Sequence, residues 1–330
     1  MIPSVSPTHR TALVTGGAGF IGSHLADRLL DIGFKVIIID NESTGLRKNV
    51  PPSSEYFIGD ISNLADLEQI FQQPIDVVFH IAGQASNIRS FDDPENDLLI
   101  NVTGTLNLLK YCLRYHVKRF LFASSMTVYG LPESLPINER EIPVPISYYG
   151  ITKYTAERYI LATANRMDLS YQFQATSFRM FNVYGERQRL DNPYQGVLGF
   201  FLGNILRNEP ITIHSDGEQT RDFVYIQDIV DAWISSIDNP ATYGQVFNLG
   251  YGEGTSINQL VDEILIANGT ARPAYPVIYG PCRPGDQRYM AADIYKANSV
   301  LGWNPKVPLS VGIPKTLAWA RKEMESSYGE

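Results

Sequence analysis

Three side chains in the first half of the sequence have the types needed to take a proton from a hydroxyl group: Ser125, Tyr149 and Lys153. Tyr149 and Lys153 are four residues apart, so on a helix they lie on one face, roughly 5–6 Å from each other. A free tyrosine titrates near pH ~10, but neighbouring positive charge, from Lys153 and from a cationic cofactor ring, favours the phenolate. Tyr149 would then be the base, and Ser125 would hold the substrate hydroxyl.

A glycine-rich turn precedes this trio. The segment TGGAGFIG at 15–22 follows the apolar run 12–15, and residues 21–30 then show helical periodicity that stops at Gly33. A strand, a glycine turn and a helix in this order are typical of dinucleotide binding, because the backbone can approach a pyrophosphate and the helix N-terminus offers N–H donors. The contacts expected here are Gly16, Gly19, Phe20, Ile21 and Gly22.

The next predicted strand, residues 35–40, ends in Asp40, about 20 residues after the glycine turn, which is the context that this fingerprint requires. A carboxylate there accepts hydrogen bonds from both ribose hydroxyls and repels a 2′-phosphate. Residues 41–43, beginning with Asn41, contain no arginine that could bind such a phosphate. The sequence therefore predicts NAD, rather than NADP, as the cofactor.

Strands and helices continue to alternate, with apolar strand-like runs at 76–81, 118–123 and 173–179. This alternation predicts an α/β fold, a Rossmann-type doubly wound parallel sheet. We expect a NAD-binding domain over residues 1–182, with 1–10 as a loose tail. Residues 183–330 should form mainly a smaller α/β substrate lobe, with segments near 223–250 crossing back. Cofactor contacts are expected at strand ends, at Asp60, Ile61, Ala82, Gly83 and Ser124.

Composition narrows the class of protein. The chain has 330 residues, 44% hydrophobic and 19% charged, and 27 basic against 35 acidic residues give a net charge of −8, which disfavours nucleic-acid binding. Its two cysteines, Cys112 and Cys282, lack metal-site spacing and are too few for a disulfide framework, so no metal is expected. No stretch is apolar enough to span a membrane. The cytoplasm is the expected compartment.

Further motifs extend the pattern along nearly the whole chain: NVTGT at 101–105, RMFNVYG at 179–185, RDFVY at 221–225, RPGD at 283–286 and LGWNP at 301–305. With the glycine turn, Asp40 and the trio, the sequence resembles the extended short-chain dehydrogenase/reductases, the NAD-dependent family that modifies nucleotide sugars.

The resemblance implies roles for individual residues. Asp60 and Ile61 would meet the adenine, Ala82 and Gly83 would line the cofactor pocket, and Asn101 would support the adjacent helix. Ser125, Tyr149 and Lys153 match the catalytic trio of the family. Asn182 would bind the substrate near its diphosphate, and Arg221 and Arg283 would clamp that diphosphate.

The resemblance also indicates the reaction. Family dehydratases and decarboxylases carry carboxylates just after the catalytic serine, where this chain has Met126 and Thr127. Without a second acid or base, elimination has no evident catalyst. The remaining outcome is removal of a hydride from C4 of the sugar and its return to the other face. We therefore expect a nucleotide-sugar 4-epimerase, acting on UDP-glucose and UDP-galactose.

The sugar is less constrained. Ala85 and Ser86, with Asn87, resemble the sugar-contacting loop, and Thr127 and Met290 would border the hexose. Methionine at such a gate is pliable, so N-acetylhexosamines stay open as substrates. Ala85 also departs from the lysine of some galactose epimerases.

Other functions remain open. Arg187 and Arg189 could reach the carboxylate of a UDP-glucuronate. A ketoreductase and a non-catalytic NAD-sensing regulator are the remaining alternatives.

Two predicted helices, 96–116 and 148–167, keep apolar residues beyond one stripe, among them Leu98, Leu109, Leu113, Tyr159 and Ile160. An exposed apolar surface of this kind is usually covered by another part of the protein or by a partner chain. In the family these helices pair across a twofold axis, so the resemblance implies a homodimer.

Overall fold

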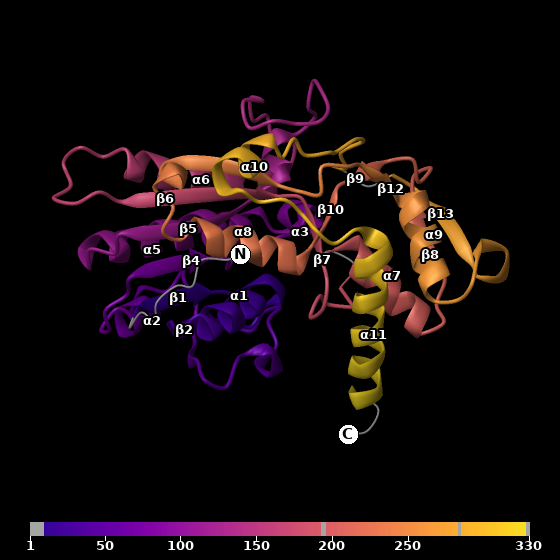
Figure 1. Cartoon of the computed structure of the whole chain (residues 1–330), viewed down its shortest axis with the longest axis horizontal. Helices are drawn as coiled ribbons and strands as arrows, with labels where there is room; N and C mark the ends of the chain where they lie inside the picture. The colour runs from indigo at the N-terminus through magenta and orange to yellow at the C-terminus, as the bar shows by residue number, and fades with distance from the viewer. Residues whose placement is uncertain (1–9, 193–195, 283–284, 328–330) are drawn as a thin grey trace.

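The computed structural model describes residues 10–192, 196–282 and 285–327, which form a larger lobe around a central sheet and a smaller lobe beside it (Figure 1). The larger lobe contains these elements up to residue 184: β1 Thr11–Thr15, α1 Phe20–Asp31, β2 Lys35–Asp40, β3 Glu55–Ile58, α2 Leu64–Ile70, β4 Val77–His80, α3 Asn87–Asp92, α4 Pro94–Leu98, the π-helical turn η2 Leu99–Thr103, α5 Gly104–Arg114, β5 Arg119–Ser125, the 3-10 turn η3 Met126–Tyr129, α6 Tyr148–Ala164, β6 Gln174–Met180 and β7 Asn182–Tyr184.

The remaining elements complete both lobes: α7 Val197–Leu206, β8 Ile211–His214, β9 Thr220–Arg221, β10 Phe223–Tyr225, α8 Ile226–Ser236, β11 Gln245–Leu249, β12 Thr255–Ser256, α9 Ile257–Ala267, β13 Val277–Gly280, α10 Tyr295–Leu301 and α11 Leu309–Ser327. Short 3-10 turns lie at Arg47–Asn49, Pro240–Thr242 and Arg272–Ala274.

The central sheet has seven parallel strands in the order β11-β6-β5-β4-β1-β2-β3. The order reverses beside β1, because β2 and β3 lie on one side of it and β4 to β6 lie on the other. This confirms the predicted doubly wound fold. In such a sheet, ligands bind where the order reverses, at the carboxyl ends of the strands.

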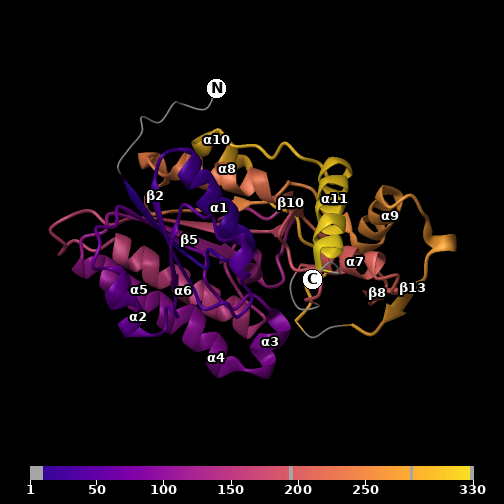
Figure 2. The same ribbon diagram turned by 90° about the horizontal axis from the view of Figure 1, so that it is seen from below.

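Helices cover both faces of the sheet (Figure 2). Alternate residues of each strand point to opposite faces, so Val14 of β1 packs in one buried cluster with Leu25 of α1 and Trp233 of α8. Leu13 packs in the other cluster, with residues of α2, α5 and α6 such as Ile160. Strands buried on both faces explain why their sequences are nearly continuous apolar runs.

Part of the chain after residue 184 returns to the larger lobe. β11 is the edge strand of the central sheet and pairs with β6, and α8 packs against α1. The smaller lobe is built mainly from α7, α9 and α11 with the parallel pair β8 and β13 (Figure 1). Within the described ranges, no helix is both long and apolar enough to cross a membrane.

Candidate active site

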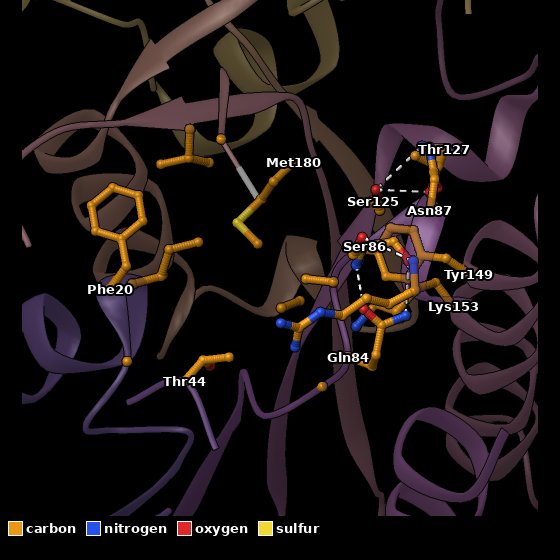
Figure 3. Close-up of a pocket in the computed structure, with 18 of the residues that line it drawn as sticks. Phe20, Thr44, Gln84, Ser86, Asn87, Ser125, Thr127, Tyr149, Lys153 and Met180 are labelled. Atoms are coloured by element: carbon orange, nitrogen blue, oxygen red, sulfur yellow. Dashed lines mark hydrogen bonds between the residues drawn. The ribbon is translucent and has the colours of Figure 1, made fainter. Parts of the chain in front are cut away.

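A cavity of about 740 Å³ lies at the carboxyl ends of the central strands and extends to the smaller lobe. Figure 3 shows Ser125, Thr127, Tyr149 and Lys153 grouped on one side of it, with Phe20 and Thr44 on the opposite side. Most residues predicted from the sequence line this cavity: Gly16, Gly19, Phe20, Ile21, Asp40, Asn41, Asp60, Ile61, Ala82, Gly83, Ala85, Ser86, Ser124, Ser125, Thr127, Tyr149, Lys153, Asn182 and Arg221. Gly22, Asn101 and Met290 do not line it.

The glycine turn between β1 and α1 is packed too tightly for side chains. Gly16 has a φ of +73°, and a Cβ there would lie 2.8 Å from the Ala82 backbone nitrogen. A Cβ on Gly22 would lie 2.2 Å from the Gly16 carbonyl oxygen. Gly22 therefore serves the turn rather than the cavity wall, because it lets the first turn of α1 pack against Gly16.

The acidic group at the end of β2 is held by the backbone. Asp40 accepts hydrogen bonds from the N–H of Ala18 at 2.9 Å and of Glu42 at 2.8 Å. Burial raises the pKa of Asp40, and these N–H donors oppose the rise. Asn41 donates to Asp60 at 2.7 Å, so a second carboxylate lies at the same end of the cavity. Two acids there suit ribose hydroxyls and disfavour a 2′-phosphate.

Helix α6, which carries Tyr149 and Lys153, starts at a cap: the Ser147 hydroxyl accepts from the Gly150 N–H at 3.1 Å. This start puts Tyr149 and Lys153 on the face of α6 that lines the cavity. The Lys153 Nζ lies 4.4 Å from the centre of the Phe122 ring. Burial lowers the pKa of Lys153 to about 8, against the opposing effect of Asp97 and Glu157.

The expected activation of Tyr149 is not a property of the chain alone. Burial raises the pKa of Tyr149 to about 12, while a hydrogen bond with Ser125 acts to lower it and the charge of Asp97 raises it further. We had expected Lys153 to contribute to a lowered pKa, but desolvation of the phenolate outweighs the charge pattern of the protein. The charges that the chain itself supplies therefore leave the pKa of Tyr149 above its ordinary value.

Ser125 ends β5 and opens the η3 turn. Its Oγ accepts from the Thr127 N–H at 3.2 Å and from the Thr127 hydroxyl at 3.0 Å. The neighbouring Ser124 donates its hydroxyl to Glu157 at 2.7 Å. Ser125 is thus fixed by its own turn with its oxygen toward Tyr149, whereas the hydroxyl of Ser124 is engaged in a buried network behind the cavity.

Asn101 lies on the π-helical turn between α4 and α5, behind the cavity wall. Its Nδ2 lies 3.1 Å from the carbonyl oxygen of Gln84, from Asp97 Oδ1 and from Thr152 Oγ1. Asn101 Oδ1 is buried and has no hydrogen-bond partner among the described residues. Asn101 contacts the two segments that carry the site and does not line the cavity.

At the substrate end, Asn182 lines the cavity, and its Oδ1 is buried without a hydrogen-bond partner in the described part of the chain. Arg221 donates to the carbonyl oxygens of Thr220 and Gln287 and forms an ion pair with Asp286. The guanidinium is thus held at the cavity by three acceptors of the chain itself. Arg283 lies outside the described residues.

Met290 does not line the cavity. Its side chain is fully buried, in an apolar cluster with Met126, Val128, Tyr129, Ile137, Phe181 and Ala292. The structure thus does not bring Met290 to the cavity, and its position next to the hexose stays a prediction. Burial of a thioether among apolar neighbours keeps it in this cluster, and the cavity wall nearby is formed by Phe181 and Gln287.

Sequence reasoning missed three residues that organise the site. Gln84 lines the cavity, while Asp97 and Thr152 are buried, and Asp97 accepts hydrogen bonds from both Gln84 and Thr152. The i, i+4 spacing of Asp97 and Asn101 was the available signal. Residues of the smaller lobe that line the far end were also missed: Phe200, Thr212, His214, Gln219 and Ile257.

This geometry can be compared with known proteins. Residues 12–250 match the NAD dependent epimerase/dehydratase family. The chain belongs to this family. A putative UDP-glucose 4-epimerase of Methanocaldococcus jannaschii is 39% identical over 94% of this chain and 98% of its own length. No group of three or more histidine, cysteine, aspartate or glutamate residues that could hold a metal ion occurs among the residues described.

Two solved structures of family members support the same fold, and one of them supports the same cofactor. A UDP-glucose 4-epimerase from Thermotoga maritima, with UDP-glucose, has a TM-score of 0.90 at 38% identity, covering 95% of this chain and 99% of its own. A UDP-glucose 4-epimerase of Thermus thermophilus in complex with NAD has a TM-score of 0.87 at 34% identity, covering 94% and 99%. NAD is the cofactor of this family member, and the glycine turn and Asp40 fit it.

Proposed function

We propose that this enzyme is a UDP-glucose 4-epimerase. One observation carries the proposal: Ser125, Tyr149 and Lys153 meet at the cavity, and the segment after Ser125 offers no carboxylate. Met126 and Thr127, in the places where an eliminating enzyme needs an acid or base, are both 8% exposed and line the same cavity. The chain therefore has the groups for one reversible oxidation and lacks those for elimination.

The residues divide the proton chemistry. The Tyr149 oxygen takes the proton of the hydroxyl at C4 of the sugar. The Ser125 hydroxyl holds the oxygen of that sugar hydroxyl in place. Lys153 stabilises the phenolate by its charge. NAD, when bound, accepts the hydride from C4 and later returns it. After the 4-keto sugar turns over in the cavity, Tyr149 gives the proton back to the oxygen at C4, and the configuration at that carbon is inverted.

The test is a panel of UDP-glucose, UDP-N-acetylglucosamine, UDP-glucuronate and dTDP-glucose, with NMR detection of products. UDP-galactose formed from UDP-glucose is the expected result. Turnover of UDP-glucuronate alone would overturn the hexose assignment. A 4-keto-6-deoxy product would overturn the argument from Met126 and Thr127.

The glucuronate alternative depends on the two arginines after the NVYG motif. Arg189 lines the cavity, but its guanidinium makes two hydrogen bonds, of 2.8 and 2.6 Å, to the carboxylate of Asp191. Arg187 pairs with Asp27 of α1 at 2.7 Å and does not line the cavity. Both arginines already have carboxylate partners in the chain, which favours a sugar with an uncharged group on C5.

We also propose a homodimer through the faces of α4, η2, α5 and α6. Exposed apolar side chains gather there: Leu98, Leu99, Leu106, Tyr148, Ile151 and Tyr159. Leu109 and Ile160, which we had assigned to this surface, are instead buried against the sheet. Light scattering after size exclusion should give twice the chain mass, and Ile151→Glu should give a folded monomer.

The compartment that we propose is the cytoplasm. Both cysteines are free thiols, Cys112 buried and Cys282 exposed, as suits a reducing environment. A reporter fusion that placed the chain in an oxidising compartment would contradict this assignment.

A further inference from the structure

Asp97 is a buried carboxylate directly behind the catalytic centre. It is the buried residue of α4, with 0% of its surface exposed, and no ion pair of Asp97 occurs within the described ranges. Burying a carboxylate is costly unless donors surround it. Asp97 receives three, from Gln84, Asn101 and Thr152. An acid kept in such a place needs a reason beyond packing.

One side of Asp97 holds the loop after β4. Gln84 Nε2 donates to Asp97 Oδ1 at 2.7 Å and to the Ser86 carbonyl at 2.9 Å. The same Gln84 accepts from the Ser86 N–H through its Oε1. Figure 3 shows Gln84 and Ser86 next to Tyr149 and Lys153. The position of the loop that follows the cofactor strand therefore depends on Asp97.

The other side of Asp97 holds the catalytic helix. Thr152 lies on α6 between Tyr149 and Lys153 in the sequence. Its hydroxyl donates to Asp97 Oδ2 at 2.6 Å. Asn101 adds a contact of 3.1 Å to Asp97 Oδ1. One carboxylate thus links the loop and the helix that form two walls of the cavity.

Charged groups near Lys153 come from several elements. Glu157 lies on α6 itself, but it is engaged by Arg179 at 2.6 Å. His80 of β4 is neutral, because burial lowers its pKa to about 3. Asp97 acts to raise the pKa of both Lys153 and Tyr149. Asp97 is therefore the acid near Lys153 that has no cationic partner in direct contact among the described residues.

We propose that Asp97 is a positioning residue of the epimerase: its hydrogen bonds hold the Gln84–Ser86 loop against α6 and place its carboxylate beside the helix that carries Lys153. The proposal rests on the proposed function, because it assigns Lys153 its role in that reaction. Asp97 does not touch the reacting atoms and acts through Lys153, Gln84 and Thr152.

Asp97→Asn is the decisive variant, because it removes only the charge. An amide oxygen can still accept from Gln84 and Asn101, and its NH2 can donate to Thr152, whose hydroxyl can turn to the Tyr149 carbonyl at 3.1 Å. Loss of the charge should lower the pKa values of Lys153 and Tyr149 together, so the whole pH profile of kcat should move toward acid. On the alkaline limb, where Lys153 loses its proton, kcat should fall roughly two- to fivefold, with KM little changed.

Thr152→Val removes the hydrogen bond from α6 and keeps the charge of Asp97, so it should lower kcat without moving the pH profile. Glu95 is an exposed acid on α4, the helix that carries Asp97, and Glu95→Gln is the matched control that should change neither kcat nor the pH profile. Thermal unfolding of each variant checks that it is folded. A pH profile of Asp97→Asn identical to that of the wild type would overturn the proposal.

A second measurement does not need turnover. NMR of ¹³Cε-labelled lysine, with the Lys153 signal assigned through Lys153→Arg, should show a lower Lys153 pKa in Asp97→Asn than in the wild type. This shift without turnover of any UDP-sugar would support Asp97 and contradict the proposed function. Turnover of UDP-glucose without the shift in the Lys153 pKa would support the proposed function and contradict the role of Asp97.

Discussion

The Glu157 carboxylate lies 2.6 Å from Nη2 of Arg179, and both side chains are almost fully buried between α6 and β6. The same carboxylate accepts from Ser124, so the pair joins the catalytic helix to the two strands below it. Breaking a buried pair leaves an uncompensated charge.

We predict that Glu157→Gln destabilises the fold by about 3–5 kcal/mol, because Arg179 would stay buried without a counter-charge. Urea unfolding measures this. The double variant Glu157→Gln with Arg179→Met should recover much of the loss. Arg166→Gln, which breaks the exposed pair with Asp168, is the control and should change little. Equal effects of the buried and exposed variants would contradict the argument.

Tyr149→Phe should remove nearly all turnover while leaving substrate binding largely intact, because the phenol is needed in the transition state and not for affinity. Ser125→Ala should be milder, on the order of 10²–10⁴-fold in kcat. Steady-state kinetics and equilibrium binding of UDP-glucose measure the two effects. A Tyr149→Phe enzyme that kept most of its rate would show that another group is the base.

The protein as purified should carry NAD, because epimerisation returns the hydride to the same cofactor. Denaturing a sample and assaying the supernatant should release about one nucleotide per chain. Asp40→Ser should weaken NAD binding by roughly 10- to 150-fold, since hydrogen bonds to a charged group are worth about 1.5–3 kcal/mol. A cofactor-free protein that prefers NADPH would refute the role of Asp40.

His80 should stay neutral well below neutral pH. Thr105 donates to the Asn101 carbonyl at 2.6 Å, so it accepts from His80 Nε2–H, and Thr15 donates to His80 Nδ1 at 2.9 Å. The pKa of His80 in the folded protein, about 3, is below its ordinary value of 6.5. The contribution of the neutral His80 to stability is therefore complete above pH 6.5 and is lost as the pH falls toward 3. The loss amounts to about 1.4 kcal/mol per pH unit.

Nitrogen-15 NMR at pH 5 should show the neutral Nε2–H tautomer for His80. Urea unfolding between pH 7 and 4 should show falling stability. A His80 ring that titrates near pH 6.5 in the folded protein would contradict the network from Thr15 to Asn101.

Met290→Ser should cost about 2–5 kcal/mol of stability, like other large-to-small changes in a core, and should leave the ratio of kcat/KM for UDP-N-acetylglucosamine and UDP-glucose unchanged. A side chain at the sugar would instead change that ratio by roughly 10- to 200-fold. A large change in the ratio with unchanged stability would restore the gate that the sequence suggested.

Local patterns in the sequence were enough for the sheet, the glycine turn and the catalytic helix. Residues 12–15 and 35–40 are continuous apolar runs, and Tyr149 and Lys153 share a helical face, so neighbours along the chain decide these features. For the same reason the strand-end position of Asp40 was predictable, since a parallel sheet brings such ends to one edge.

Tertiary structure decided which partner each side chain has. Met290 is buried in an apolar cluster, Arg189 is engaged by Asp191, and Asp97 links a loop to α6. The raised pKa of Tyr149 likewise depends on how much water the folded lobes exclude. Burial and pairing are sums over residues far apart in the chain, and periodicity within one segment carries no information about them.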